Sequence, residues 1–226
     1  MTFSARATLS AEQQCTGRHT VANELHADVQ RWAMSSNYET HELYAKFLDL
    51  LKKSPLYTSE KFIGFRGRRF DSANKPSRLD MGPPPAQDAR GQRYSKQNYP
   101  ALYLSETKAG VLREPISGSD PLWIQKFVIP IATLRIADFR VENTSELATQ
   151  VFWFAEHAGE ASVMPPIEFS QFVASLVARQ FDGMLVPGIR GDREYRYSNL
   201  VVLKRVDEWK MWLHESDPHL GISSAA

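Results

Sequence analysis

The sequence predicts an α+β or mixed α/β domain, because segments with helical periodicity precede short strands that are interleaved with further helices. In the first 57 residues, apolar side chains recur three or four positions apart, as on the buried face of a helix. From residue 61 onward, short runs rich in Ile, Val and Phe take over, which is typical of strands. A chain of 226 residues suits one domain with an extension.

Each element follows from a local pattern, and turn-forming residues separate the elements. Ser54 and Pro55 end the second helix, because a residue before proline disfavours helical backbone. Ser105 or Thr107 is expected to cap a short helix that runs through Val111 and Leu112. The predicted helices otherwise cover 21–32, 43–51, 145–157 and 167–180, and the predicted strands cover 61–70, 101–104, 123–131, 134–139, 184–186 and 200–203.

These elements divide the chain into three segments. We expect an N-terminal helical extension at 1–57, a main catalytic domain at 58–215 and a C-terminal tail at 216–226. The two N-terminal helices either pack against the core, which the apolar spacing favours, or form an arm that binds a partner or a second copy of the chain in a homodimer.

Composition excludes several classes of function. The net charge of +1 gives no general case for binding nucleic acid or a membrane. Apolar runs fall short of the roughly 20 residues of a membrane helix, and the N-terminus lacks a signal-peptide core. The single cysteine, Cys15, forms no internal disulfide, and the six histidines show no metal-ligand spacing. We therefore expect a cytoplasmic protein without a metal site, with export lacking a signal peptide left open.

The stretch 81–115 carries the candidate chemistry: Arg93, then Tyr103, then Glu114. Arginine grips phosphate with two parallel hydrogen bonds. Tyrosine offers a flat face for a ring and a hydroxyl at its edge. A carboxylate stabilises an oxocarbenium-like centre or orients an attacking water. Surface charges and a core tyrosine would give the same spacing, so this trio alone leaves the function open.

The surrounding motifs resemble the RES domain family, which is named for its Arg, Glu and Ser. The resemblance covers roughly residues 60–205. Its motifs are Arg66-Gly67, Pro83 to Pro85, Gly91-Gln92-Arg93, Ser95 to Asn98, Leu102-Tyr103-Leu104, Glu114, Phe181 to Pro187 and Asn199-Leu200-Val201.

This resemblance implies an ADP-ribosyltransferase-like split sheet with flanking helices, and an enzyme that degrades NAD. RES proteins are typically toxins of toxin–antitoxin pairs; they break the nicotinamide–ribose bond and pass ADP-ribose to water or inorganic phosphate. By resemblance, Arg66 and Arg93 hold the pyrophosphate or ribose side, Tyr103 stacks on or orients the nicotinamide end, and Glu114 steadies the ribosyl cation or positions the acceptor. NAD is then a substrate, no separate cofactor is expected, and the implied partner is an antitoxin or immunity protein.

Three positions depart from the family pattern. Gly188 stands where the family has its serine, and Ser198 replaces that hydroxyl in NAD binding only if the intervening loop folds back. Gln92 separates the usual Gly-Arg pair. Asn98 replaces a turn glycine, which is tolerable because asparagine readily takes positive φ.

Other readings of the sequence stay open. The enzyme could transfer ADP-ribose to a macromolecule, or the loss of the serine could mark a weakened domain that only binds a nucleotide or a protein. The loop 188–199 could hold phosphate or single-stranded nucleic acid through Arg190, Arg193 and Arg196, although interspersed acidic residues favour a solvated loop.

Overall fold

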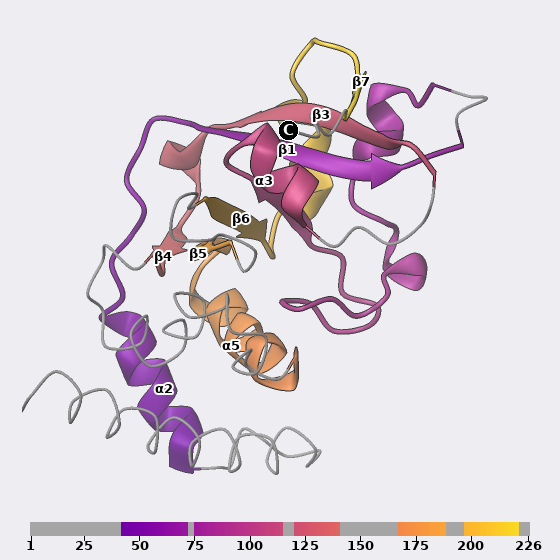
Figure 1. The fold of residues 1–226 in the computed structure, drawn as a ribbon. Helices are drawn as coiled ribbons and strands as arrows, with labels where there is room; N and C mark the ends of the chain where they lie inside the picture. Colours follow the sequence, from indigo (N-terminus) through magenta and orange to yellow (C-terminus); the bar gives the residue numbers. More distant parts are fainter. Residues whose placement is uncertain (1–41, 72–74, 115–119, 141–166, 189–196, 222–226) are drawn as a thin grey trace, which may run out of the picture.

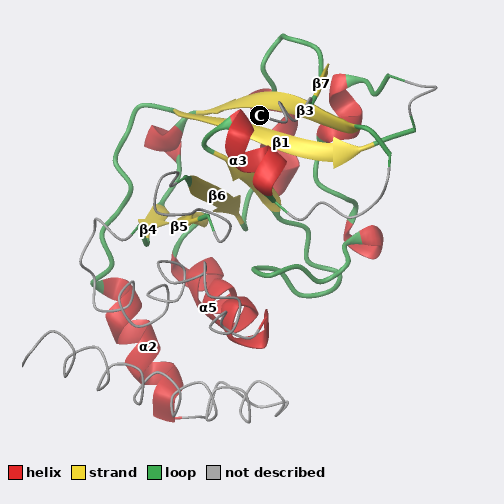
Figure 2. Cartoon of the chain, viewed as in Figure 1, coloured by secondary structure: helices red, strands yellow, loops and turns green. Residues whose placement is uncertain are grey.

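The computed structural model describes residues 42–71, 75–114, 120–140, 167–188 and 197–221 (Figure 1). They form an α+β fold around a seven-stranded sheet of order β4-β5-β6-β2-β1-β3-β7 (Figure 2). Only β4 and β5 pair in parallel; the other neighbours are antiparallel. The strands are β1 Phe62–Arg69, β2 Leu102–Ser105, β3 Leu122–Ile129, β4 Ile136–Asp138, β5 Gly183–Pro187, β6 Ser198–Val202 and β7 His219–Leu220. The α+β class expected from the sequence is therefore confirmed.

Few helices accompany this sheet in the described ranges. They are α2 Glu42–Lys52, α3 Lys108–Arg113 and α5 Ile167–Gln180, with 3₁₀ turns η2 Arg78–Met81, η3 Ala86–Asp88, η4 Ile131–Thr133 and η5 Val206–Trp212. The helices expected at 43–51 and 167–180 are confirmed, whereas those at 21–32 and 145–157 lie outside the described residues. The strand expected to reach residue 131 ends at Ile129, because Pro130 has no N–H to donate to a ladder.

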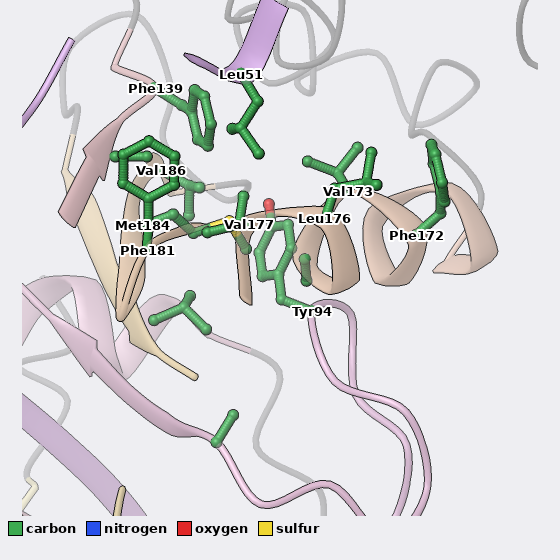
Figure 3. Close-up of a cluster of buried hydrophobic side chains, with 14 of the residues drawn as sticks. Leu51, Tyr94, Phe139, Phe172, Val173, Leu176, Val177, Phe181, Met184 and Val186 are labelled. Atoms are coloured by element: carbon green, nitrogen blue, oxygen red, sulfur yellow. The ribbon is translucent and has the colours of Figure 1, made fainter. Parts of the chain in front are cut away.

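Two apolar clusters cover the two faces of the sheet, as the alternation of side chains along a strand requires. On β6, Val201 belongs to one cluster while Leu200 and Val202 belong to the other. The first cluster joins the sheet to α2 and α5; Figure 3 shows Leu51 of α2 facing Phe139 and the row of α5 side chains beside Met184. The second contains a set of residues from the other face and from η5: Phe62, Leu102, Leu104, Phe127, Ile129, Leu185 and Trp212.

Residues from both predicted flanking segments contact the main domain. The helix α2 falls inside the predicted N-terminal extension, and its Tyr44 and Leu51 are buried in the same cluster as α5, which agrees with the core packing that the apolar spacing favours. The strand β7 falls inside the predicted tail, yet it pairs with β3 at the edge of the sheet. The pairing of β7 depends on a distant strand, so a local reading of the sequence does not show it. The described part of the chain has no helix whose length and hydropathy would let it cross a membrane.

The junction between β1 and β2 is the narrowest connection in the sheet. It consists of one residue pair, Phe65 with Ser105, whereas β1 pairs with β3 over its whole length and β2 pairs with β6 over its whole length. Beyond this pair, β1 after Phe65 and β2 before Ser105 are therefore not paired with each other. Arg66 and Tyr103 stand at this divergence.

Candidate functional site

Arg93 lies at the corner of a tight turn that the backbone closes on itself. The N–H of Gln92 donates to the Ser95 carbonyl at 2.8 Å, and the N–H of Ser95 donates back to the Gln92 carbonyl at 3.2 Å. Gln171, on α5, donates its side-chain amide to the same two carbonyls, at 2.8 and 3.1 Å. A helix of the core thus fixes the turn that presents Arg93, although Gln171 and its partner Gln92 are 79 positions apart in the sequence.

The end of the same loop confirms one detail expected from the sequence. Asn98 has a φ of 66°, the left-handed conformation that a turn glycine would take. Its N–H donates to the Ala89 carbonyl at 2.9 Å, which closes the loop around the Arg93 turn. Asparagine therefore takes the left-handed backbone conformation at this position without a glycine.

Tyr103 supports this turn from β2. Its hydroxyl accepts the N–H of Tyr94 at 3.0 Å and donates to Oγ of Ser95 at 3.3 Å. Its ring stacks on that of Tyr94, with centroids 6.4 Å apart and planes at 27°. Burial raises the pKa of Tyr103 to about 12, although the hydrogen bonds to Ser95 and from Tyr94 oppose this shift, so the hydroxyl remains neutral and able both to donate and to accept.

Tyr94 links the turn to the core. It is buried in the cluster that contains Leu176 and Val177 of α5, beside which its ring lies in Figure 3. Burial raises the pKa of Tyr94; among nearby charges, Arg93 lowers the pKa while Tyr103 and Glu114 raise it further. The contacts of Tyr103 with Tyr94 and Ser95 join it to the turn that carries Arg93. Glu114 is held by Asn199, which pairs with Ser105 at the end of the strand that carries Tyr103.

Arg66 joins the group as a buried cation. Its side chain is 9% exposed, and Nη1 makes one long hydrogen bond of 3.4 Å to the carbonyl of Tyr103. Nε has no hydrogen-bond partner among the described residues, and no carboxylate of that part of the chain forms an ion pair with Arg66. Burial, reinforced by the neighbouring Arg68, lowers the pKa of Arg66 to about 10, so the guanidinium is still charged at neutral pH.

Glu114 is positioned by the short helix α3. Thr107 caps α3, as expected, by accepting the N–H of Gly110 at 2.9 Å, and Glu114 is the residue that ends the helix. Its Oε1 accepts two hydrogen bonds, one from the hydroxyl of Tyr197 at 2.9 Å and one from Nδ2 of Asn199 at 2.7 Å. A carboxylate that is unfavourable at a helix end for the dipole is stabilised here by two donors from β6 and the residue before it.

Ser198 is the predicted site residue that the structure does not bring to this group. It begins β6, pairs with Pro187, and donates its N–H to Oε2 of Glu106 at 3.2 Å. Tyr197 and Asn199, its neighbours on either side, are the residues that reach Glu114. Successive side chains of a strand point to opposite faces, so the Ser198 side chain lies on the face away from Glu114.

Sequence reasoning missed four residues of the site: Tyr94, Gln171, Tyr197 and Asn199. Tyr197 and Asn199 carried a usable signal, because residues two apart in a strand share a face. Gln171 carried none, because its partners are backbone carbonyls of a distant loop. Residues 189–196, with the three arginines of the alternative phosphate site, lie outside the described residues.

No protein-family model matches the chain, and no curated protein matches its sequence significantly. Within the described residues, no cluster of three or more His, Cys, Asp and Glu side chains could hold a metal ion. The groups that the site offers for chemistry are two guanidinium groups, a carboxylate and a stacked pair of tyrosines.

Proposed function

We propose that this protein is an NAD-degrading enzyme, similar to RES-type toxins, that breaks the nicotinamide–ribose bond and passes ADP-ribose to water or inorganic phosphate. The observation that carries the proposal is the buried Arg66 guanidinium without a carboxylate partner in the described part of the chain. A buried charge costs several kcal/mol, on the order of the whole stability margin of a domain, unless a partner neutralises it. An anionic ligand would supply that partner.

A pyrophosphate fits the groups that surround Arg66. Guanidinium groups bind phosphate oxygens with two parallel hydrogen bonds. Arg66 donates to the carbonyl of Tyr103, and the hydroxyl of Tyr103 bonds to the turn that carries Arg93. The turn at Gln92–Ser95 holds Arg93 on a backbone that two hydrogen bonds close and Gln171 clamps. We assign the two arginines to the pyrophosphate or ribose side of NAD.

Glu114 supplies the complementary charge at the other end of the group. Cleavage of the nicotinamide–ribose bond places positive charge on the ribose, and a fixed carboxylate stabilises that charge or orients the acceptor. Nicotinamide leaves as a neutral molecule from a cationic ring, so the reaction needs no strong general acid. The neutral Tyr103, with its pKa of about 12, suits a supporting and stacking role at the nicotinamide end.

The narrow β1–β2 junction is what supports an ADP-ribosyltransferase-like arrangement. A sheet that is joined through one residue pair behaves as two sheet halves, and Arg66 and Tyr103 stand where the halves separate. On this proposal the protein acts as a toxin inside cells by depleting NAD, and an antitoxin or immunity protein would protect the cell that makes it.

The test is to incubate the purified full chain with NAD, with and without inorganic phosphate, and to identify the products by mass spectrometry. We expect nicotinamide with ADP-ribose, or with its phosphorylated form when phosphate is the acceptor. The Glu114→Ala protein should lose this activity, whereas Glu60→Ala, at an exposed glutamate, should retain it. An absence of NAD loss at micromolar wild-type protein would contradict the proposal, and labelled NAD would reveal transfer to a macromolecule instead.

A further inference from the structure

Tyr197 occupies a space that two glycines leave open. A Cβ atom built on Gly110 of α3 would lie 2.7 Å from Cδ2 of the Tyr197 ring, and one built on Gly188 would lie 2.5 Å from the same atom. Real Cβ atoms do not approach another carbon this closely, and an aromatic ring cannot bend aside. The N–H of Gly188 also donates to the Tyr197 carbonyl at 2.7 Å, which fixes the backbone of both residues.

This placement of the ring determines where its hydroxyl lies. The buried Tyr197 and the half-buried Asn199 share one face at the start of β6, and both donate to Oε1 of Glu114. Two donors on one carboxylate oxygen restrict the rotation of the whole group. In the described part of the chain, Oε2 receives no hydrogen bond, so it is the oxygen left for a ligand.

We propose that Tyr197 and Asn199 are positioning residues that hold Glu114 through Oε1, and that Gly110 and Gly188 are part of the site because they admit the tyrosine ring. This inference rests on the proposed NAD cleavage. A side chain at residue 188 and the Tyr197 ring exclude each other, so glycine at this position makes room for the tyrosine that holds Glu114. The departure from the family pattern at Gly188 is therefore a different construction of the site, in which a tyrosine hydroxyl reaches the catalytic carboxylate.

The kinetic signature of a positioning residue differs from that of a binding residue. A carboxylate that rotates freely spends less time in the reactive geometry, which lowers kcat, while contacts to the pyrophosphate and hence KM are untouched. Tyr197→Phe removes only the hydroxyl and keeps the ring between the glycines. We expect kcat for NAD loss to fall about tenfold with KM within about twofold of wild type. Tyr99→Phe, at a tyrosine that is 69% exposed, is the matched control and should leave both constants unchanged.

Gly188→Ala tests whether a glycine is needed at this position to admit the Tyr197 ring. Its added methyl group displaces the ring, so we expect a larger loss than in Tyr197→Phe, about 100-fold in kcat if the chain folds. Combining Gly188→Ala with Tyr197→Gly removes the ring that the new methyl group would meet, so folding should recover. The double variant still lacks the hydroxyl that holds Glu114, so its activity should stay low. Wild-type kcat in Tyr197→Phe, or a change confined to KM, would overturn the inference.

A readout without NAD separates this inference from the proposed function. In a double-mutant cycle of Tyr197→Phe and Glu114→Ala, the shifts in denaturation midpoint should be non-additive, because the two side chains share one hydrogen bond. Additive shifts would contradict the inference that Tyr197 holds Glu114. Should the wild-type protein leave NAD intact, the proposed function fails, and non-additive midpoints would still support the hold on Glu114.

Discussion

The two charged ends of the candidate site are built in opposite ways. At the acidic end, Glu114 accepts hydrogen bonds from Tyr197 and Asn199, so the protein itself satisfies one oxygen of the carboxylate. At the cationic end, the buried Arg66 makes one hydrogen bond of 3.4 Å and leaves Nε without a partner among the described residues. The first end is largely complete within the protein, and the second is not.

This difference indicates which end depends on a ligand. A carboxylate held by two donors is stabilised in the folded protein whether or not a substrate is present. A buried guanidinium without a counter-charge lowers stability until an anion binds. We therefore expect changes at the acidic end to affect mainly turnover, and changes at the cationic end to weaken binding while they keep or raise stability.

The largest expected effect comes from Glu114→Gln. The amide retains an oxygen that can accept both hydrogen bonds, but it lacks the charge that stabilises the ribosyl cation. We expect NAD loss to fall by about 100-fold or more, and the free energy of unfolding to stay within about 0.5 kcal/mol of wild type. Product formation measures the rate of NAD loss, and denaturant unfolding measures the stability. A Glu114→Gln protein with wild-type activity would show that the reaction does not use the charge of Glu114.

Arg66→Met should separate binding from stability. We expect NAD or ADP-ribose affinity to fall at least about tenfold, while the free energy of unfolding stays level or rises by about 1–4 kcal/mol, because an unpaired buried charge is replaced by an apolar side chain.

Arg68→Met is the matched control for Arg66→Met. Arg68 donates to the carbonyls of Asp80 and Gly82 at 2.6 and 3.1 Å, so its loss should destabilise the protein by about 1–3 kcal/mol with a smaller effect on affinity. Equal destabilisation by the two changes would show that Arg66 is a structural residue like Arg68.

Gln171→Ala is expected to loosen the Arg93 turn without unfolding the core. The change removes two hydrogen bonds to carbonyls of the turn, worth about 1 kcal/mol each. We expect a rise in KM for NAD of about three- to tenfold. Gln180→Ala, on the same helix α5, should leave KM unchanged. Steady-state kinetics of the two variants show whether the hydrogen bonds from Gln171 to the turn support NAD binding.

The smallest effect is a dependence of stability on alkaline pH. An unfolded tyrosine loses its proton near pH 10, whereas burial raises the pKa of Tyr103 to about 12 and also raises that of Tyr94. Between these values the folded state binds more protons than the unfolded state, so stability is complete below pH 10 and falls as pH rises toward 12. Thermal unfolding across this range should show the decline in stability. A smaller decline in Tyr103→Phe would attribute it to the ionisation of Tyr103.

Features with a local cause were predictable from the sequence. Thr107 caps α3 through a hydrogen bond to a residue three positions away, Asn98 takes a positive φ that its own side chain tolerates, and α5 matches the periodicity of 167–180. Each depends on a few neighbouring residues, so the sequence carries the information directly.

Contacts across the fold were not predictable in the same way. The pair Tyr197–Glu114 spans 83 positions, and it exists only because the β2–β6 register brings the end of β2 to the start of β6. Ser198 shows how sensitive such inferences are to register, because a shift of one residue along β6 moves a side chain to the other face. The contact of Arg66 with Tyr103 is likewise a property of the sheet order, because β1 and β2 are neighbours.

Calorimetric titration of the wild-type and Arg66→Met proteins with ADP-ribose isolates the role of the buried Arg66, since this ligand carries the pyrophosphate but cannot be cleaved at nicotinamide. We expect one binding event in the wild-type protein, at least about tenfold weaker in Arg66→Met. Absence of binding to the wild-type protein, or equal affinity in both, would contradict the assignment of the buried Arg66 to an anionic ligand.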